Sequence, residues 1–113
     1  MHRSARKGSR FEREIVNTLK EAGLDAKRAY SSNGLSLGLT ADVDVLIEGK
    51  WKVQAKRYKR LNKLIRPEET VDFQIVREDL GKTFVILPLE MLIDFLKHKK
   101  LAREVIEEKD DSF

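Results

Sequence analysis

Residues 41–60 read ADVDVLIEGKWKVQAKRYKR, and this stretch decides the expected fold. Two β-forming runs, 42–48 and 51–57, flank Gly49, which predicts a β-hairpin with residues 48–50 as its loop. Side chains alternate along a strand, so an apolar face that includes Trp51 should join the core. The opposite face carries Asp42, Asp44, Leu46, Lys52, Gln54 and Lys56.

The polar face of the hairpin is a candidate catalytic site. With this loop Asp44 lies directly opposite Gln54, about 5 Å away at Cβ, and Lys56 follows on the same face. Carboxylate and amide oxygens are ligands that Mg²⁺ accepts. A nearby lysine can orient a water or stabilise a developing negative charge. The alternative interpretation is an amphipathic hairpin whose polar face is simply solvated.

The charge of the chain is concentrated in segments. The 113 residues carry a formal net charge of +4, while residues 1–10 and 50–66 contain basic residues and no acid. Local basic charge favours a nucleic-acid partner, and a solvated lysine-rich surface is the alternative. The chain lacks cysteine, which excludes disulfides and thiolate metal sites, and no apolar run is long enough for a membrane span. We therefore expect a cytoplasmic protein without a membrane partner.

The remaining pattern predicts one α/β domain with a central mixed sheet flanked by helices. A helix over 8–23 should be capped by Ser9 and end at Gly23. After the hairpin, residues 59–69 indicate a short basic helix or a loop. Further expected elements are a strand at 25–32, strands at 71–79 and 83–88 around a turn, and a helix at 89–100 continuing toward 111. Residues 1–7 are expected to form a basic flexible N-terminus, and residues 104–113 an acidic tail.

Glu12 adds a third acidic group. At about 100° per residue it falls beside the apolar stripe of the first helix, which contains Phe11, Ile15, Leu19 and Ala22. Burying an unpaired charge is costly, so a metal ion or a basic partner would explain this position. The alternative is a carboxylate at the edge of the stripe that reaches water.

Four segments together resemble the archaeal-type Holliday junction resolvases and related phage endonucleases of the PD-(D/E)XK superfamily. The segments are KGSRFEREIVNTLKEAG (7–23), KRAYSS (27–32), DVLIEGKWKVQAK (44–56) and IVREDLGKTFVILPLEMLIDFL (75–96). The resemblance implies the restriction-endonuclease-like fold and a Mg²⁺-dependent endonuclease, with Mn²⁺ as a substitute. It also implies a four-way DNA junction as substrate, a homodimer, and a protein that a phage or virus could encode.

The resemblance also implies roles for individual residues. Glu12 and Asp44 match metal-site acids, Lys56 matches the catalytic lysine, and Ser32, with Ser31, matches a serine-bearing loop near the site. Asp42 is a rival or an assistant to Asp44. The expected DNA contacts are Lys7, Arg10, Arg13, Arg28, Lys52, Arg57, Lys59 and Arg60.

Gln54 departs from the family pattern, which has glutamate at this position. Glutamine keeps an oxygen ligand and loses a negative charge, so we expect weaker metal binding. Gln54 therefore leaves open a DNA-binding module that does not cleave. A separate alternative is a nuclease of the same fold with a nicking or repair target.

Overall fold

The computed structural model describes residues 3–29 and 39–111, and for residues 3–7 and 108–111 it describes the backbone alone. The elements are α1 (Arg3–Glu21), β1 (Ala26–Arg28), β2 (Val45–Ile47), β3 (Trp51–Val53), β4 (Gln74–Arg77), β5 (Thr83–Ile86) and α2 (Leu89–Asp111). The chain forms two compact units, Met1–Tyr58 and Lys59–Phe113. The single-domain organisation stays a prediction.

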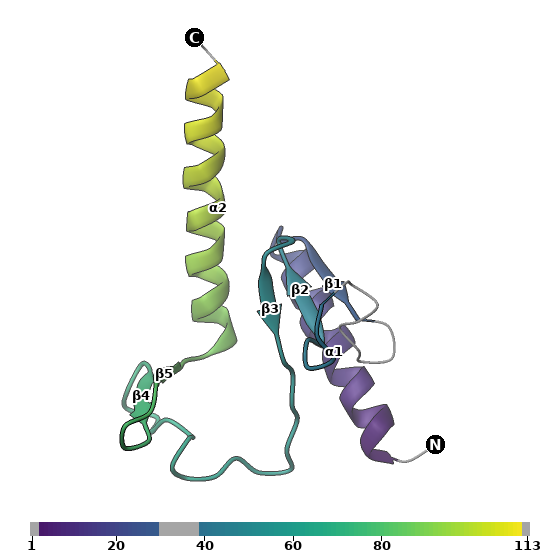
Figure 1. Ribbon diagram of the computed structural model, residues 1–113, viewed down its shortest axis with the longest axis vertical. Helices are drawn as coiled ribbons and strands as arrows, with labels where there is room; N and C mark the ends of the chain where they lie inside the picture. Colours follow the sequence, from purple (N-terminus) through teal and green to yellow (C-terminus); the bar gives the residue numbers. More distant parts are fainter. Residues whose placement is uncertain (1–2, 30–38, 112–113) are drawn as a thin grey trace. The chain divides into compact units, whose positions relative to one another are not determined.

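In the first unit, α1 lies along one face of the sheet β1–β2–β3 (Figure 1). The core consists of apolar side chains from the helix and the strands, among them Ile15, Val16, Leu19, Ala26, Val45 and Ile47. Both strand pairs are antiparallel, with Ala26 opposite Ile47 and Ile47 opposite Trp51. This packing places one face of α1 over the end of the hairpin that carries Asp44.

Helix α1 ends as the sequence predicts and begins earlier than expected. Gly23 has φ +88°, the Gly23 N–H donates to the Lys20 carbonyl at 3.0 Å, and the Leu24 N–H donates to the Leu19 carbonyl at 3.0 Å. These two bonds form a Schellman motif, in which glycine supplies the left-handed residue. The expected start at residue 8 was wrong, because the helix begins at Arg3, and Ser9 therefore lies inside the helix and does not cap it.

The hairpin loop at 48–50 is confirmed. Glu48 and Gly49 have φ values of +53° and +65°, and the Lys50 N–H donates to the Ile47 carbonyl at 3.0 Å, as in a type I′ turn. Asp25 holds Glu48 in this uncommon conformation, because its N–H donates to the Glu48 carboxylate at 2.6 Å. The expected burial of Trp51 was wrong: 36% of the residue is exposed, and the Lys50 Nζ lies 4.6 Å from the ring centroid.

The strands of the hairpin are shorter than the sequence pattern suggests. The pairing ends at Val45 and Val53, so Asp44 and Gln54 are not paired across the ladder. The Asp44 N–H donates to the Val53 carbonyl at 2.8 Å, and the Ala55 N–H donates to the Asp44 carboxylate at 2.7 Å. The side chain of Asp44 thus takes the backbone donor that a longer ladder would use.

The second unit contains the antiparallel pair β4–β5 and the helix α2. Its turn at Leu80 and Gly81 is confirmed, and α2 runs without a break to Asp111, as expected for the C-terminal helix. Residues 59–69 form no helix, which corresponds to the loop alternative. The expected mixed sheet is not observed: all strand pairs among the described residues are antiparallel and belong to two sheets. The tight turns after β2 and β4 make the pairs β2–β3 and β4–β5 antiparallel, since a parallel pair needs a crossover connection.

We expect Gly49→Ala to lower the free energy of unfolding by about 1 kcal/mol, because alanine resists the left-handed conformation. A Cβ at Gly49 would meet no atom within 4 Å, so the cost is conformational and not steric. Urea unfolding measures the change. Gly49→Asn is the matched control and should lose less, because asparagine enters this region more readily. An alanine variant as stable as the wild type would contradict the turn assignment.

Candidate active site

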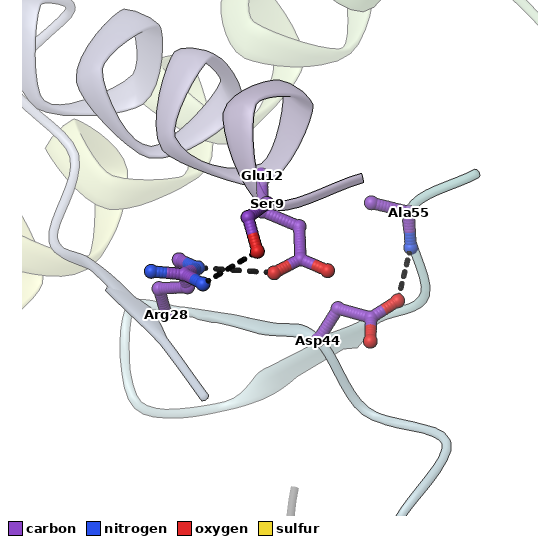
Figure 2. A network of polar contacts seen from close by, with 5 residues as sticks. All are labelled: Ser9, Glu12, Arg28, Asp44 and Ala55. Carbon is purple, nitrogen blue, oxygen red and sulfur yellow. Dashed lines mark hydrogen bonds and ion pairs between the residues drawn. The ribbon is translucent and has the colours of Figure 1, made fainter. Parts of the chain in front are cut away.

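Glu12 is a buried carboxylate on the inner face of α1. The residue is 3% exposed and shares this face with Ile15, Val16 and Leu19, so the sequence-based expectation of an inward acid is confirmed. The Arg28 Nε donates to the Glu12 Oε2 at 3.0 Å. Figure 2 shows the Glu12 side chain extending from the helix toward the sheet, with the guanidinium of Arg28 beside it. An ion pair with a basic residue therefore compensates the burial of this charge.

Ser9 completes this contact. The Arg28 Nη2 donates to the Ser9 Oγ at 3.2 Å (Figure 2). Ser9 and Glu12 are three residues apart on α1, so both acceptors lie on the same face of the helix. Ser9 was expected only as a helix cap and not as a site residue, although its spacing from Glu12 was a usable signal.

Asp44 is the second buried carboxylate. It is 9% exposed, and its backbone joins both neighbouring strands, since its carbonyl accepts from the Ala29 N–H at 2.8 Å and its N–H donates to Val53. Its Oδ2 accepts the Ala55 N–H at 2.7 Å. In Figure 2 the Asp44 carboxylate rises from the end of β2 on the side of the sheet where α1 lies. This backbone donor was also missed, because no sequence pattern identifies which N–H a carboxylate will accept.

The other expected metal-site and catalytic residues that the structure describes are exposed, unlike Glu12 and Asp44. Gln54 and Lys56 are exposed and flank Ala55, one residue to either side. Asp42 is exposed in a turn, whereas Asp44 is buried. Ser31 and Ser32 lie outside the described residues.

The expected DNA contacts differ in whether their side chains are directed inward or exposed. Arg28 is directed inward at Glu12 and Ser9, with 24% of its side chain exposed. The other described side chains are exposed: Arg10, Arg13, Lys52, Arg57, Lys59 and Arg60. Lys59 and Arg60 belong to the second unit. Lys7 lies in α1, and its side chain is outside the described part of the chain.

The donor atoms of the site fit a hard divalent cation. Within the described side chains, no group of three or more His, Cys, Asp or Glu is arranged to hold a metal. Glu12 and Asp44 supply two carboxylates, and the residue that would supply a third acid is Gln54. Mg²⁺ commonly binds one or two carboxylates and keeps several waters, so two carboxylates and an amide oxygen suffice as ligands.

Comparison with known proteins identifies the class of this site. Residues 3–97 match the family model of the archaeal Holliday junction resolvase (hjc). The chain belongs to this family, which confirms the resemblance seen in the sequence. Members are endonucleases of the restriction-endonuclease-like fold that act on DNA junctions, generally with a divalent metal. No curated protein and no solved structure matches the chain.

All candidate site residues lie within the matched range. Residues 98–111 of α2 extend beyond it. Among the described residues, neither helix is long and apolar enough to cross a membrane.

We expect Arg28→Ala to lower the free energy of unfolding by about 3 kcal/mol, because it leaves the buried Glu12 charge without this partner. Chemical denaturation followed by circular dichroism measures the loss. Arg13→Ala is the matched control, since Arg13 is exposed on α1, the helix that carries Glu12, and should change stability by no more than about 0.5 kcal/mol. Equal effects of the two substitutions would contradict the structural importance of the ion pair.

Proposed function

We propose that the protein is a Mg²⁺-dependent, structure-selective DNA endonuclease that resolves Holliday junctions by paired phosphodiester cuts. The observation that carries this proposal is the pair of buried carboxylates, Glu12 and Asp44, which α1 and β2 place within one unit of a chain belonging to the resolvase family. Gln54 and Lys56 follow on either side of the amide that binds Asp44. This arrangement supports phosphodiester hydrolysis.

The proposed ligands of the ion are Asp44, Glu12 and the amide oxygen of Gln54. A bound divalent ion would acidify a water and offset negative charge on a phosphoryl oxygen. Asp44 is the principal acid in this proposal, because it is buried and held by Ala55, whereas Asp42 is exposed. Its Oδ2 accepts the Ala55 N–H, so its Oδ1 would be available to the ion. Asp42 assists by adding negative charge nearby, and Mn²⁺ substitutes for Mg²⁺.

Lys56 positions the attacking water in this proposal. Water attacks phosphorus in line, the bond to the 3′ oxygen breaks, and the products carry a 5′-phosphate and a 3′-hydroxyl. The Lys56 ammonium also stabilises negative charge that develops on the phosphoryl group. Ser32 belongs to the proposed site by resemblance.

Exposed basic residues supply the DNA-binding surface of the proposal. Arg10, Arg13, Lys52 and Arg57 lie in the first unit and are exposed, so they are available to phosphates. Such contacts fix the position of DNA without reading its sequence. Two symmetric cuts in a four-way junction require two active sites, so we propose a two-fold homodimer. The proposed substrate places the protein in the cytoplasm.

We expect Asp44→Asn and Lys56→Ala each to lower the rate of junction cleavage about 100-fold or more while the fold is kept. Asparagine retains an oxygen that can accept the Ala55 N–H, so the first variant removes charge and little else. The assay compares a four-way junction with a linear duplex of equal sequence in Mg²⁺. Glu14→Gln and Lys20→Ala are the matched controls, because both residues are exposed on α1, and should cleave at the wild-type rate.

Two results would contradict this proposal in different ways. Unchanged cleavage by both variants would show that the catalytic residues are wrong. Equal cleavage of junction and duplex would favour a nuclease of the same fold with a nicking or repair target.

Gln54 supports a second candidate function, a junction-binding module that does not cleave. We expect Gln54→Glu to tighten Mn²⁺ binding about tenfold and to lower the Mg²⁺ concentration needed for cleavage, because it restores a negative ligand. Isothermal titration and cleavage at graded Mg²⁺ measure both effects. A wild-type protein that binds junctions and never cuts in Mg²⁺ or Mn²⁺ would establish the binding module.

A further inference from the structure

Arg28 differs from the other arginines expected to contact DNA. Two of its N–H donors are directed inward, one at the Glu12 carboxylate at 3.0 Å and one at the Ser9 hydroxyl at 3.2 Å. Only 24% of its side chain is exposed, while Arg10 and Arg13 on the neighbouring helix are exposed. The guanidinium therefore serves as a bridge between β1 and α1.

The placement of Glu12 depends on this bridge. The Glu12 side chain is 4% exposed and lies on the apolar face of α1, where an uncompensated carboxylate is costly. The planar guanidinium fork reaches two acceptors on one helix face at once, which the single ammonium of a lysine does less well. Ser9 fixes one arm of the fork, so the other arm meets the carboxylate in a defined direction.

We infer that Arg28 is a positioning residue that holds the Glu12 carboxylate toward the metal site, with Ser9 as its support, and that it does not contact the DNA backbone. This inference rests on the proposed metal-binding role of Glu12. Arg28 acts through Glu12 and touches neither the substrate nor the reacting atoms. It is therefore distinct from the exposed arginines, whose contribution is to bind phosphates.

The first experiment measures junction affinity against salt concentration in EDTA. Removing an arginine that contacts a phosphate lowers the slope of log affinity against log salt by about 1. Arg28→Gln should keep the wild-type slope, whereas the matched control Arg13→Gln should lose about 1 unit of slope. A slope that falls by about 1 in Arg28→Gln overturns the inference.

A second variant keeps this experiment decisive if Arg28→Gln does not fold. Glu12→Gln/Arg28→Gln removes both charges of the pair at once and leaves two neutral amides in the helix–strand contact. It is compared directly with the wild type in the same salt series. An unchanged slope supports the inference, and a slope lowered by about 1 overturns it.

The second experiment measures the affinity of the DNA-free protein for Mn²⁺ by isothermal titration. Arg28→Lys keeps the positive charge and loses the planar guanidinium, so it tests whether the two directed hydrogen bonds matter apart from the charge. We expect about tenfold weaker Mn²⁺ binding, as for other residues that orient a metal ligand. Ser9→Ala should weaken binding in the same direction by a smaller factor. Wild-type Mn²⁺ affinity in Arg28→Lys overturns the inference.

The two experiments separate this inference from the proposed function. A wild-type protein that binds no Mn²⁺ would refute the proposed metal site. The salt series would still decide whether Arg28 contacts DNA or is held within the protein. Mn²⁺ binding by the wild type together with a lowered slope in Arg28→Gln would refute the inference and leave the proposed metal site intact.

Discussion

Asp44 is the residue on which the first unit depends. Its carbonyl accepts from Ala29, its N–H donates to Val53 and its carboxylate accepts from Ala55, so one residue connects the ends of β1, β2 and β3. The same bonds stop the ladder at Val45 and Val53. The chain beyond β3 is thereby released from the sheet, and Gln54 and Lys56 are exposed on either side of the amide that holds the carboxylate. The candidate site therefore lies where the sheet ends, because the same residue forms both.

A second constraint is the charge of Glu12. Most helices keep carboxylates on their solvent face, because burial of a charge without a partner is unfavourable. In α1 the carboxylate lies among the core residues, and the cost is offset by Arg28 from the adjacent strand. In other proteins, replacing a buried ion pair by apolar residues is often tolerated or even stabilising. Here the pair holds a second buried acid on the side of the sheet where the Asp44 carboxylate lies (Figure 2).

The sequence predicted those features that depend on local chemistry. Gly23 ends α1 because only glycine adopts its backbone conformation at low cost, and Gly49 marks the loop at 48–50 for the same reason. Helical periodicity placed Glu12 beside the apolar stripe of the first helix, and the residue is buried. Features that depend on which acceptor a backbone N–H donates to were missed. Strand length could not be read from alternation, because the Asp44 side chain takes an N–H that the ladder would have used. The inward contacts of Arg28 were missed, because an arginine on a strand is equally compatible with a DNA contact. The sequence does not show that Ser9 and Glu12 of α1 lie opposite Arg28.

The Schellman turn at Gly23 has a consequence for how the protein is made. It reverses the chain between α1 and β1, so Glu12 and Arg28 meet across only 16 residues of sequence. Loops of this length close quickly and at little entropic cost. During synthesis the N-terminal segments leave the ribosome first. The charge pair can therefore assemble before the hairpin is free to pack, and the helix–strand unit then provides the surface on which the second acid is added.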